Sequence, residues 1–366
     1  MRRAESTRRS TARAAGAPLG VALIALCSAC LPFDACVALP KRPRELDHPG
    51  VRVGAQWLAS RVYFDDARLG AITHIRRRSS GEFAVVGQRG AAFLAPDAGA
   101  PSRFLPFAVA AGHAELLEWP GDEPRYLDRG GGGWRTGGLI GHHGRGMWQP
   151  DQLMGMDDLA AGDLDGDGIP EFVVGYNGDG GIHLLDAAGR RLWQEPDSNV
   201  WHVEIVDTDG DGKAEIVHSN AAGQVTIRDA TGKVLRRTTS GGPYVSGFSL
   251  VEWPRGQIGI LNTGEAVVDL LDFGGVPRLS LVTPNSGFLN DVVGALVRVG
   301  SDDHVALVLT DDHWERTQLF VFDIGGRLQY REVLAGTCSS VAPAAADGFL
   351  LGCGVRVYEY VGRKIP

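Results

Sequence analysis

Short apolar stretches separated by turn residues run along most of this chain. Residues 171–176 and 225–228 are examples, with the length and the β-branched content of β-strands. No apolar pattern with a helical period extends over ten residues, whereas the 51 glycines and 19 prolines fall between the apolar stretches and mark turns. The pattern therefore predicts an all-β protein with many short strands.

Two neighbouring segments are near copies of each other. The first begins with Asp163-Leu-Asp-Gly-Asp-Gly-Ile-Pro-Glu171, and the second, 44 residues later, with Asp207-Thr-Asp-Gly-Asp-Gly-Lys-Ala-Glu215. The match continues into an Asp-Ala-x-Gly turn that starts at Asp186 in one copy and at Asp229 in the other. Each copy reads as four short strands, with the acidic loop between the first two. A repeat of this length and content is typical of a β-propeller.

The same rhythm continues, more faintly, along the rest of the chain. Entry strands are expected every 44 to 47 residues, near Leu69, His113, Asp157, His202, Gly247, Val292 and Ser339. The last unit has only three strands, and residues 51–62 have strand composition without a unit of their own. Because open sheet edges are a liability, we expect residues 51–62 to be the fourth strand of the last unit. The prediction is one propeller over residues 51–366 with seven four-stranded blades, or eight if the glycine-rich stretch 130–146 holds a further one.

The first 38 residues predict export. Five arginines precede an apolar run at 19–26 that is too short to span a bilayer, as in a secretory signal peptide. The sequence Ser28-Ala-Cys30 resembles the end of a bacterial lipobox, in which Cys30 is lipidated, while cleavage by an ordinary signal peptidase is the alternative. We expect residues 1–38 to be a leader and linker, and the protein to be lipid-anchored in the bacterial cell envelope or secreted.

The charge of the chain argues against a nucleic-acid partner. The formal net charge is −8, and it becomes −12 when residues 1–29 leave with five arginines and one glutamate. A negative surface repels phosphate groups but suits the binding of cations. We therefore expect no nucleic acid, no membrane contact beyond a lipid on Cys30, and a monomer.

Two cysteines near the C-terminus are candidates for a disulfide. Cys338 and Cys353 lie 15 residues apart and flank two short apolar runs. In an oxidising compartment they are expected to join neighbouring strands, and the alternative is two buried free thiols.

The acidic loops have the composition of calcium sites. Carboxylates occupy positions 1, 3, 5 and 9, which are Asp163, Asp165, Asp167 and Glu171 in one loop and Asp207, Asp209, Asp211 and Glu215 in the other. A glycine at position 6 permits a sharp turn, after which the carbonyl of position 7, Ile169 or Lys213, is expected to face the same centre. Ca²⁺ takes six to eight oxygen ligands, so we predict one calcium ion for each loop. An EF-hand is rejected because its acid lies at position 12 and helices flank its loop.

These loops and their strands resemble FG-GAP repeats of the VCBS type, the units of the integrin α-subunit propeller and of many bacterial surface proteins. The resemblance is clearest over residues 157–240. It implies that each loop joins the first two strands of a blade and holds one calcium ion. We therefore expect a non-catalytic, calcium-binding propeller that presents a surface to an unidentified protein or glycan ligand.

Two enzymatic alternatives remain open. In a propeller of the polysaccharide-lyase type, His142 and His143 would line a sugar site together with Trp134 and Trp148, although a glycine-rich surface loop is the simpler interpretation. In a quinone-dependent dehydrogenase, the segment from Asp186 to Trp193 would be a docking motif, but it is one residue short before its glycine. We interpret Trp193 as a residue that packs between blades.

Overall fold

The structure is a computed structural model. It describes residues 52–53, 57–96, 100–121, 123–130, 137–150, 155–239, 247–253, 256–262, 267–271, 277–283, 289–311 and 316–363. The leader 1–38, with Cys30, and Trp134 lie outside the described residues, so the calls made on them stay predictions. Within the described part of the chain, no helix is long and apolar enough to cross a membrane.

The described strands form seven antiparallel sheets, numbered here by the chain order of their innermost strands. Sheet 1 holds β3 (Ile72–Arg77), β4 (Phe83–Gly87), β5 (Gly90–Leu94) and β6 (Pro101–Pro106). Sheet 2 holds β7 (Ala114–Leu117), β8 (Arg125–Asp128), β9 (Gly138–Ile140) and β10 (Gly146–Trp148). Sheet 3 holds β11 (Met156–Gly162), β12 (Glu171–Tyr176), β13 (Ile182–Leu185) and β14 (Arg191–Glu195). Sheet 4 holds β15 (Val200–Val206), β16 (Glu215–Asn220), β17 (Gln224–Arg228) and β18 (Val234–Thr239).

The remaining sheets have the same order, with additions from the start of the chain. Sheet 5 holds β19 (Gly247–Trp253), β20 (Gly256–Asn262), β21 (Val267–Leu271) and β22 (Pro277–Val282). Sheet 6 holds β23 (Leu289–Val299), β24 (Asp302–Asp311), β25 (Arg316–Asp323), β26 (Leu328–Ala335) and β1 (Arg52–Val53). Sheet 7 holds β27 (Cys338–Pro343), β28 (Phe349–Cys353), β29 (Arg356–Gly362) and β2 (Leu58–Asp65), and a short 3₁₀ helix, η3 (Ala67–Leu69), leads into sheet 1.

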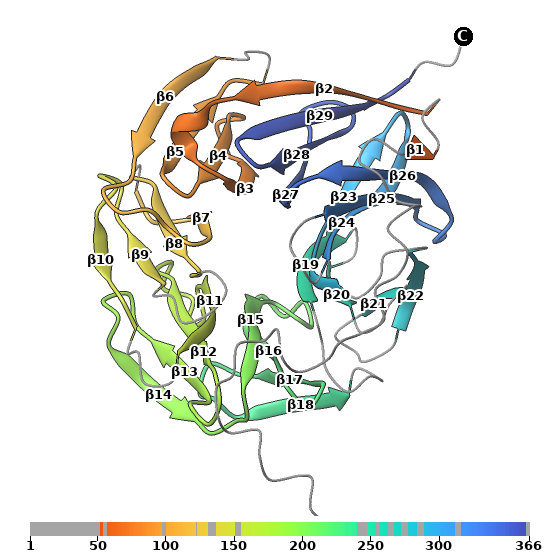
Figure 1. The fold of residues 1–366 in the computed structure, drawn as a ribbon. Coiled ribbons are helices and arrows are strands. Elements are labelled where there is room, and N and C mark those ends of the chain that lie inside the picture. Colours follow the sequence, from red (N-terminus) through yellow and green to blue (C-terminus); the bar gives the residue numbers. More distant parts are fainter. Residues whose placement is uncertain are drawn as a thin grey trace, which may run out of the picture. The chain divides into compact units, whose positions relative to one another are not determined.

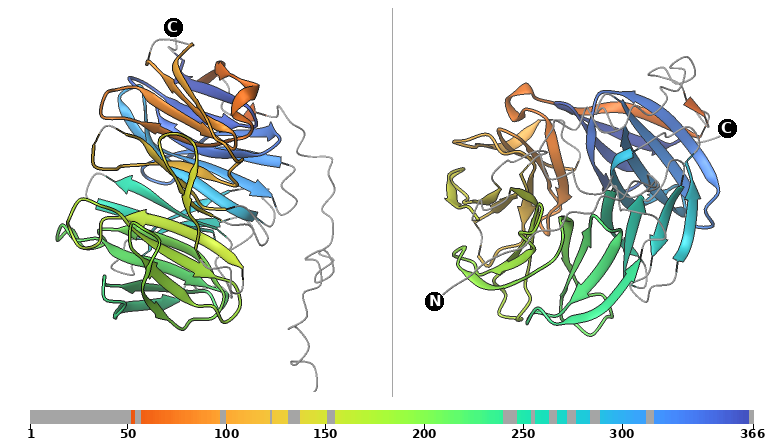
Figure 2. Two further views of the ribbon diagram at one scale, coloured as in Figure 1. Left: turned by 90° about the vertical axis from the view of Figure 1, so that its left-hand side faces the viewer. Right: turned by 60° about the horizontal axis from the view of Figure 1, so that its bottom comes forward.

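The sheets follow one another around a closed ring (Figure 1). The innermost strands of the seven sheets are β3, β7, β11, β15, β19, β23 and β27. Strand β3 contacts β7, β8 contacts β11, and contacts continue from β11 through β15, β19, β23 and β27 back to β3. Figure 2 shows the same sheets from two further directions. The architecture is a β-propeller, as the repeat predicts.

The closing strand differs in its bounds from the expectation. The strand that completes sheet 7 is β2, which pairs Leu58 with Gly362 and Asp65 with Arg356, so it begins later than the expected 51–62. Residues Arg52 and Val53 instead pair with β26 at the outer edge of sheet 6. Strand β29 has seven residues, too few to pair with a continuous strand over residues 51–62. Arg52 and Val53 therefore extend the neighbouring sheet.

The core of the ring lies between adjacent sheets. Strands β4, β12, β16 and β28 are buried at every position, because a second strand is covered on both faces by neighbouring sheets. Between sheets 3 and 4, for example, Ala160 and Val173 share one apolar cluster with Val203 and Ile216. Each sheet therefore depends on both of its neighbours for the burial of its side chains.

Tryptophans on two outer strands join their sheets to the next sheet. Trp148 Nε1 donates a hydrogen bond of 3.1 Å to the carbonyl oxygen of Ala187, and its indole lies so close to Gly189 that a Cβ there would be 2.8 Å from Cδ2. Trp193 Nε1 donates in the same way to Ala230, at 2.9 Å, and packs beside Gly232. Both contacts are made to an Asp-Ala-x-Gly turn of the next sheet, which explains why that turn recurs in the sequence.

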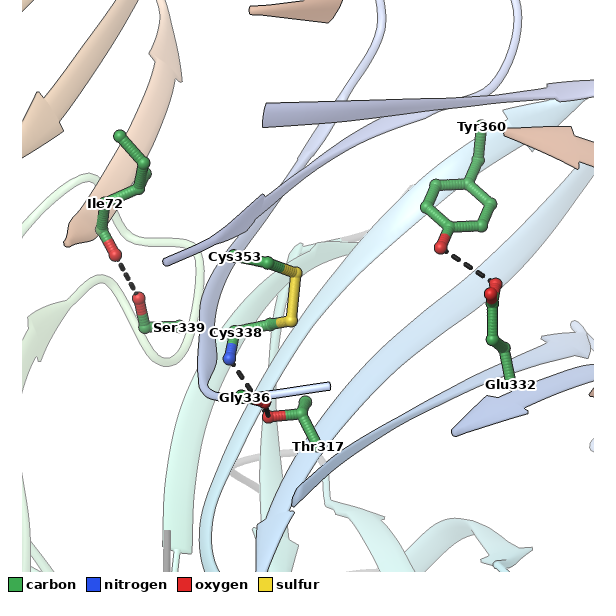
Figure 3. Close-up of a disulfide and its surroundings, with 8 residues drawn as sticks. All are labelled: Ile72, Thr317, Glu332, Gly336, Cys338, Ser339, Cys353 and Tyr360. Atoms are coloured by element: carbon green, nitrogen blue, oxygen red, sulfur yellow. Dashed lines mark hydrogen bonds between the residues drawn. A yellow bond between two sulfur atoms is a disulfide. The ribbon is translucent and has the colours of Figure 1, made fainter. Parts of the chain in front are cut away.

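The disulfide and its surroundings connect sheet 7 to its neighbours (Figure 3). Cys338 and Cys353 are bonded in this structure, and they are opposite residues of β27 and β28. Cys338 N donates to Thr317 Oγ1 of sheet 6, at 3.0 Å, and Ser339 Oγ donates to the carbonyl of Ile72 in sheet 1, at 2.5 Å. Sheet 7 is thereby held to the sheets on both sides where the ring closes.

We expect Trp193→Ala to lower the free energy of unfolding by about 2–4 kcal/mol, because it removes a large partly buried side chain between two sheets. Trp193→Phe should cost less, since it keeps the ring and loses mainly the hydrogen bond to Ala230, worth about 1 kcal/mol. Urea unfolding measures both values. The neighbouring Leu192→Ala is the control, since Leu192 is 56% exposed, and equal losses in Trp193→Ala and Leu192→Ala would contradict the packing role.

Removing the disulfide by Cys338→Ala/Cys353→Ala should lower the free energy of unfolding by about 3 kcal/mol, because the bond closes a loop with a sequence separation of 15 residues. Thermal melts of this variant and of the parent treated with reductant should agree. A parent that melts at the same temperature with and without reductant would refute this expectation.

Candidate functional site

Each acidic loop joins the first strand of a sheet to the second. The first loop follows β11, which pairs Gly162 with Glu171 of β12, and the second follows β15, which pairs Val206 with Glu215 of β16. The loops therefore lie at equivalent places in sheets 3 and 4, as the sequence repeat predicts.

Backbone amides fold the first loop around Asp163. Its Oδ1 accepts from Gly166 N at 2.7 Å and its Oδ2 accepts from Gly168 N at 2.9 Å. Both glycines have positive φ, 81° and 83°, in open space, so their backbone conformation rather than lack of room requires glycine. Sequence reasoning singled out Gly168 and missed the equal requirement at Gly166.

The second loop repeats this geometry. Asp207 Oδ1 accepts from Gly210 N at 2.7 Å and Oδ2 from Gly212 N at 2.9 Å, and these hydrogen bonds, the bond from Gly212 foremost, lower the pKa of Asp207. The loop glycines again have positive φ, 81° and 87°. The two loops differ in some of the residues between their acids, and they nevertheless adopt the same conformation.

Three of the four predicted acids in each loop come together. Oxygen atoms of Asp163, Asp165 and Glu171 lie within 4.8 Å of one another. Those of Asp207, Asp209 and Glu215 do the same. The structure does not place position 5 in either group.

The acid at position 5 accepts a hydrogen bond from the backbone two residues on, as the acid at position 3 also does. Asp167 Oδ1 accepts from Ile169 N at 2.7 Å, and Asp211 Oδ1 accepts from Lys213 N at 2.8 Å. These hydrogen bonds hold the backbone of Ile169 and Lys213, the residues whose carbonyl oxygens are predicted to be calcium ligands. All three aspartates of each loop thus shape the turn, and those at positions 1 and 3 also gather with the glutamate.

The last acid of each loop is buried and closes it. Glu171 is 7% exposed and its Oε2 accepts from Leu164 N at 2.9 Å. Glu215 is 6% exposed and its Oε2 accepts from Thr208 N at 2.8 Å and from Thr208 Oγ1 at 2.6 Å. A buried glutamate therefore anchors each loop to the start of the second strand.

The first loop carries negative charge that no cation among the described residues balances by an ion pair. Burial raises the pKa of Glu171, the charges of Asp165, Asp167 and Asp163 add to the rise, and the hydrogen bond from Leu164 opposes it. Among the described residues, no ion pair reaches these carboxylates. Carboxylate oxygens without a counter-ion fit a hard divalent cation, so the residues present suit Ca²⁺.

The residues of the enzymatic alternatives are only partly brought together. His142 Nδ1 lies 2.9 Å from Glu123 Oε2, and the rings of His142 and His143 are 5.1 Å apart, in the turn between β9 and β10. Trp148 instead packs on Gly189 and on Phe172, with ring centroids 4.6 Å apart. Packing between sheets thus explains both Trp148 and Trp193.

The structure also gathers charged residues that the sequence analysis did not single out. Arg129 forms ion pairs with Asp158 at 2.8 Å and Glu204 at 3.0 Å, on the first strands of sheets 3 and 4. The repeat marks the first strands that carry Asp158 and Glu204, because these strands recur every 44 or 45 residues. It gives no signal for Arg129, which lies outside those strands.

Comparisons with known proteins agree with the fold. The profile of the FG-GAP-like repeat family matches residues 163–218, which span both acidic loops. The fold is similar to that of a streptogramin B lyase, with a TM-score of 0.60 and 10% identity over 85% of this chain and 100% of that chain. No curated protein matches the sequence significantly. Likeness at this identity shows a shared propeller fold and nothing further.

In calcium-free buffer, we expect the ionisation of Glu171 to make a contribution that lowers the free energy of unfolding as the pH rises above about 4.5. The pKa of Glu171 is raised in the folded protein, so its stabilising contribution is present below the unfolded pKa and is lost as it ionises. Glu171→Gln keeps an acceptor for Leu164 N and should remove this part of the decrease. Urea unfolding of the parent and of Glu171→Gln between pH 4 and 8 with EDTA measures the difference between their slopes, with the exposed Asp179→Asn as control. Equal slopes in the parent and in Glu171→Gln would contradict the prediction.

Proposed function

We propose that this chain is an exported, non-catalytic β-propeller that binds one calcium ion in each of its two acidic loops. The observation that carries the proposal is the repetition of one geometry in adjacent sheets: the same backbone hydrogen bonds and the same three gathered carboxylates. A solvated acidic turn without a bound ion does not need to repeat both the hydrogen bonds and the gathered carboxylates in two loops of one chain.

The proposed role of calcium is structural. The carboxylates of positions 1, 3 and 9 would hold the ion, and the ion would neutralise charge that otherwise opposes the folding of the loop. Calcium modules outside the cell bind with dissociation constants of about 10⁻⁴–10⁻³ M. At a calcium concentration ten times the dissociation constant, each site would stabilise the fold by about 1.4 kcal/mol.

Export is supported by two independent features of the chain. Residues 1–38 have the pattern of a secretory leader, with Cys30 as the candidate for lipidation. The disulfide between Cys338 and Cys353 suits an oxidising compartment. We infer that the protein acts in the cell envelope or outside the cell, where calcium is available at the required concentration.

The proposed activity is the presentation of a surface to a protein or glycan ligand. The acidic loops stand at the ends of β11 and β15, with Ile169 and Lys213 exposed at their tips. Two loops held by the same backbone hydrogen bonds in adjacent sheets would offer a preformed surface, which lowers the entropy cost of binding a partner. Packing between sheets accounts for Trp148 and Trp193, two tryptophans of the enzymatic alternatives, which favours a binding protein over an enzyme.

Calorimetric titration with calcium tests the proposal. The parent should bind about two ions per chain, and Asp165→Ala/Asp209→Ala, which alters one gathered carboxylate in each loop, should bind none and lose the calcium-dependent rise in melting temperature. The control Asp179→Ala/Asp302→Ala makes the same change of charge at two acids outside the loops. A parent that binds no calcium, or a loop variant that binds as the parent does, would refute the calcium sites.

A further inference from the structure

A histidine is buried between sheets 3 and 4. His218 of β16 is 1% exposed, and it lies opposite Val203 of β15 and Thr226 of β17. Ile216, two residues earlier and on the same face of β16, belongs to the apolar cluster between these two sheets. The imidazole is therefore enclosed between sheets 3 and 4.

The hydrogen bond that His218 accepts requires a neutral imidazole. Arg228 of β17 donates from Nε to His218 Nε2 at 3.1 Å. A guanidinium has no acceptor, so Nε2 carries the lone pair and the proton of the neutral ring lies on Nδ1. Nδ1 lies 3.7 Å from Oδ2 of Asp197, which follows β14 of sheet 3. Both of these atoms are buried and have no hydrogen-bond partner among the described residues.

Both sheets bring charged groups to this place. Asp197 and Glu195 come from sheet 3, and Glu195 Oε2 lies 4.0 Å from Arg228 Nη1. Arg228 on β17 and Arg237 on β18 come from sheet 4. Burial lowers the pKa of His218 to about 4; Asp197 opposes this decrease, whereas the two arginines add to it. The ring is therefore neutral at pH 7 and gains a proton only in acid.

The fold itself does not require this histidine and arginine. The equivalent residues of sheet 3 are Val174, 44 residues before His218, and Leu185, 43 residues before Arg228. Both are buried in the apolar cluster between sheets 2 and 3. A buried charged group costs desolvation that an apolar side chain of similar size does not. Sheet 4 thus departs from its own repeat where it meets sheet 3.

Arg228 connects His218 to the contact that joins the two sheets. Its Nη1 donates to the carbonyl of Gly232 at 2.7 Å. Gly232 ends the turn that receives Trp193 of sheet 3, whose Nε1 donates to the carbonyl of Ala230 at 2.9 Å. A Cβ on Gly232 would lie 3.3 Å from Cδ2 of Trp193. A displacement of Arg228 would therefore disturb the turn on which Trp193 packs.

We propose that His218 and Arg228 form a pH-sensitive switch, which holds sheets 3 and 4 together at neutral pH and loosens their contact when His218 is protonated. An imidazolium donates from both nitrogens, so Nε2 no longer accepts from Arg228, and two cations then lie side by side inside the protein. The new charge is attracted to Asp197 on the other side of the ring, which favours the same separation. Arg228 moves away, and the turn that it holds moves with it.

The switch makes stability depend on pH in one direction. The pKa of His218 is lower in the folded protein than its ordinary value of 6.5, so the unfolded chain binds more protons between pH 4 and 6.5. The contribution of the neutral ring to stability is therefore fully present above about pH 6.5 and is lost as the pH falls toward 4. This direction is opposite to the one expected from Glu171.

Urea unfolding at pH 7 and 5 tests the switch against His218→Val/Arg228→Leu, which copies the residues of sheet 3. From pH 7 to 5, the unfolding equilibrium constant of the parent should rise about tenfold more than that of this variant, which is less than full coupling to one such histidine would give. The comparison cancels the contributions of other titrating groups. His142→Val, at an exposed histidine, should keep the pH dependence of the parent. Equal pH dependence in the parent and the double variant would overturn the proposal.

Exchange of two indole protons tests whether the contact between the sheets loosens. Trp193 Nε1–H bonds from sheet 3 to sheet 4, and Trp148 Nε1–H bonds in the same way from sheet 2 to sheet 3. The exchange rate of Trp193 Nε1–H in the parent, divided by that in the double variant, should rise about tenfold from pH 7 to 5. The same ratio for Trp148 should stay constant. A constant ratio for Trp193, or an equal rise for Trp148, would overturn the proposal.

A measurement on the parent covers the case in which the double variant does not fold. Proton–nitrogen NMR should show His218 with its proton on Nδ1 at pH 7 and a pKa of about 4, and the Trp193 Nε1–H signal should change along the same titration. A proton on Nε2, a pKa near the ordinary 6.5, or a Trp193 signal that does not follow the titration would overturn the proposal. All measurements are made in saturating calcium and none reports the occupancy of the acidic loops. Failure of this inference is thus distinguishable from failure of the calcium proposal.

Discussion

The packing of each sheet against the next is the interaction on which the rest of this structure depends. Second strands such as β12 and β16 are buried at every position, so no sheet satisfies its apolar surface alone. Because every sheet needs a neighbour on both sides, the row of sheets must close into a ring, and β2 closes it by pairing with β29. The indoles of Trp148 and Trp193 and the hydrogen bond from Ser339 to Ile72 fix adjacent sheets at one spacing.

The positions of the acidic loops and of the ion pairs of Arg129 follow from this arrangement of inner strands. The acidic loops connect the ends of β11 and β15 to the next strand, so a cation in each loop would brace one sheet. Arg129 instead forms ion pairs with Asp158 and Glu204, on the inner strands of two further sheets, so these ion pairs exist only when the sheets are assembled. The loops are thus local to a sheet, whereas the ion pairs of Arg129 are a product of the ring.

The sequence predicts what is local and repeated, and it fails where distant segments meet. The Asp-x-Asp-x-Asp-Gly spacing was sufficient to place both loops, and the rhythm of turns was sufficient for the propeller. The bounds of the closing strand were not predictable, because the split between Val53 and Leu58 depends on the lengths of β26 and β29. Arg129 could not be found, because its partners Asp158 and Glu204 are 29 and 75 residues away.

Anomalous diffraction from crystals grown with calcium tests the central claim, that the two loops are the calcium sites of a propeller, most directly. The account predicts one anomalous peak among Asp163, Asp165 and Glu171 and a second among Asp207, Asp209 and Glu215. Crystals grown in millimolar calcium with no peak at either loop, or with ions bound only elsewhere, would contradict it.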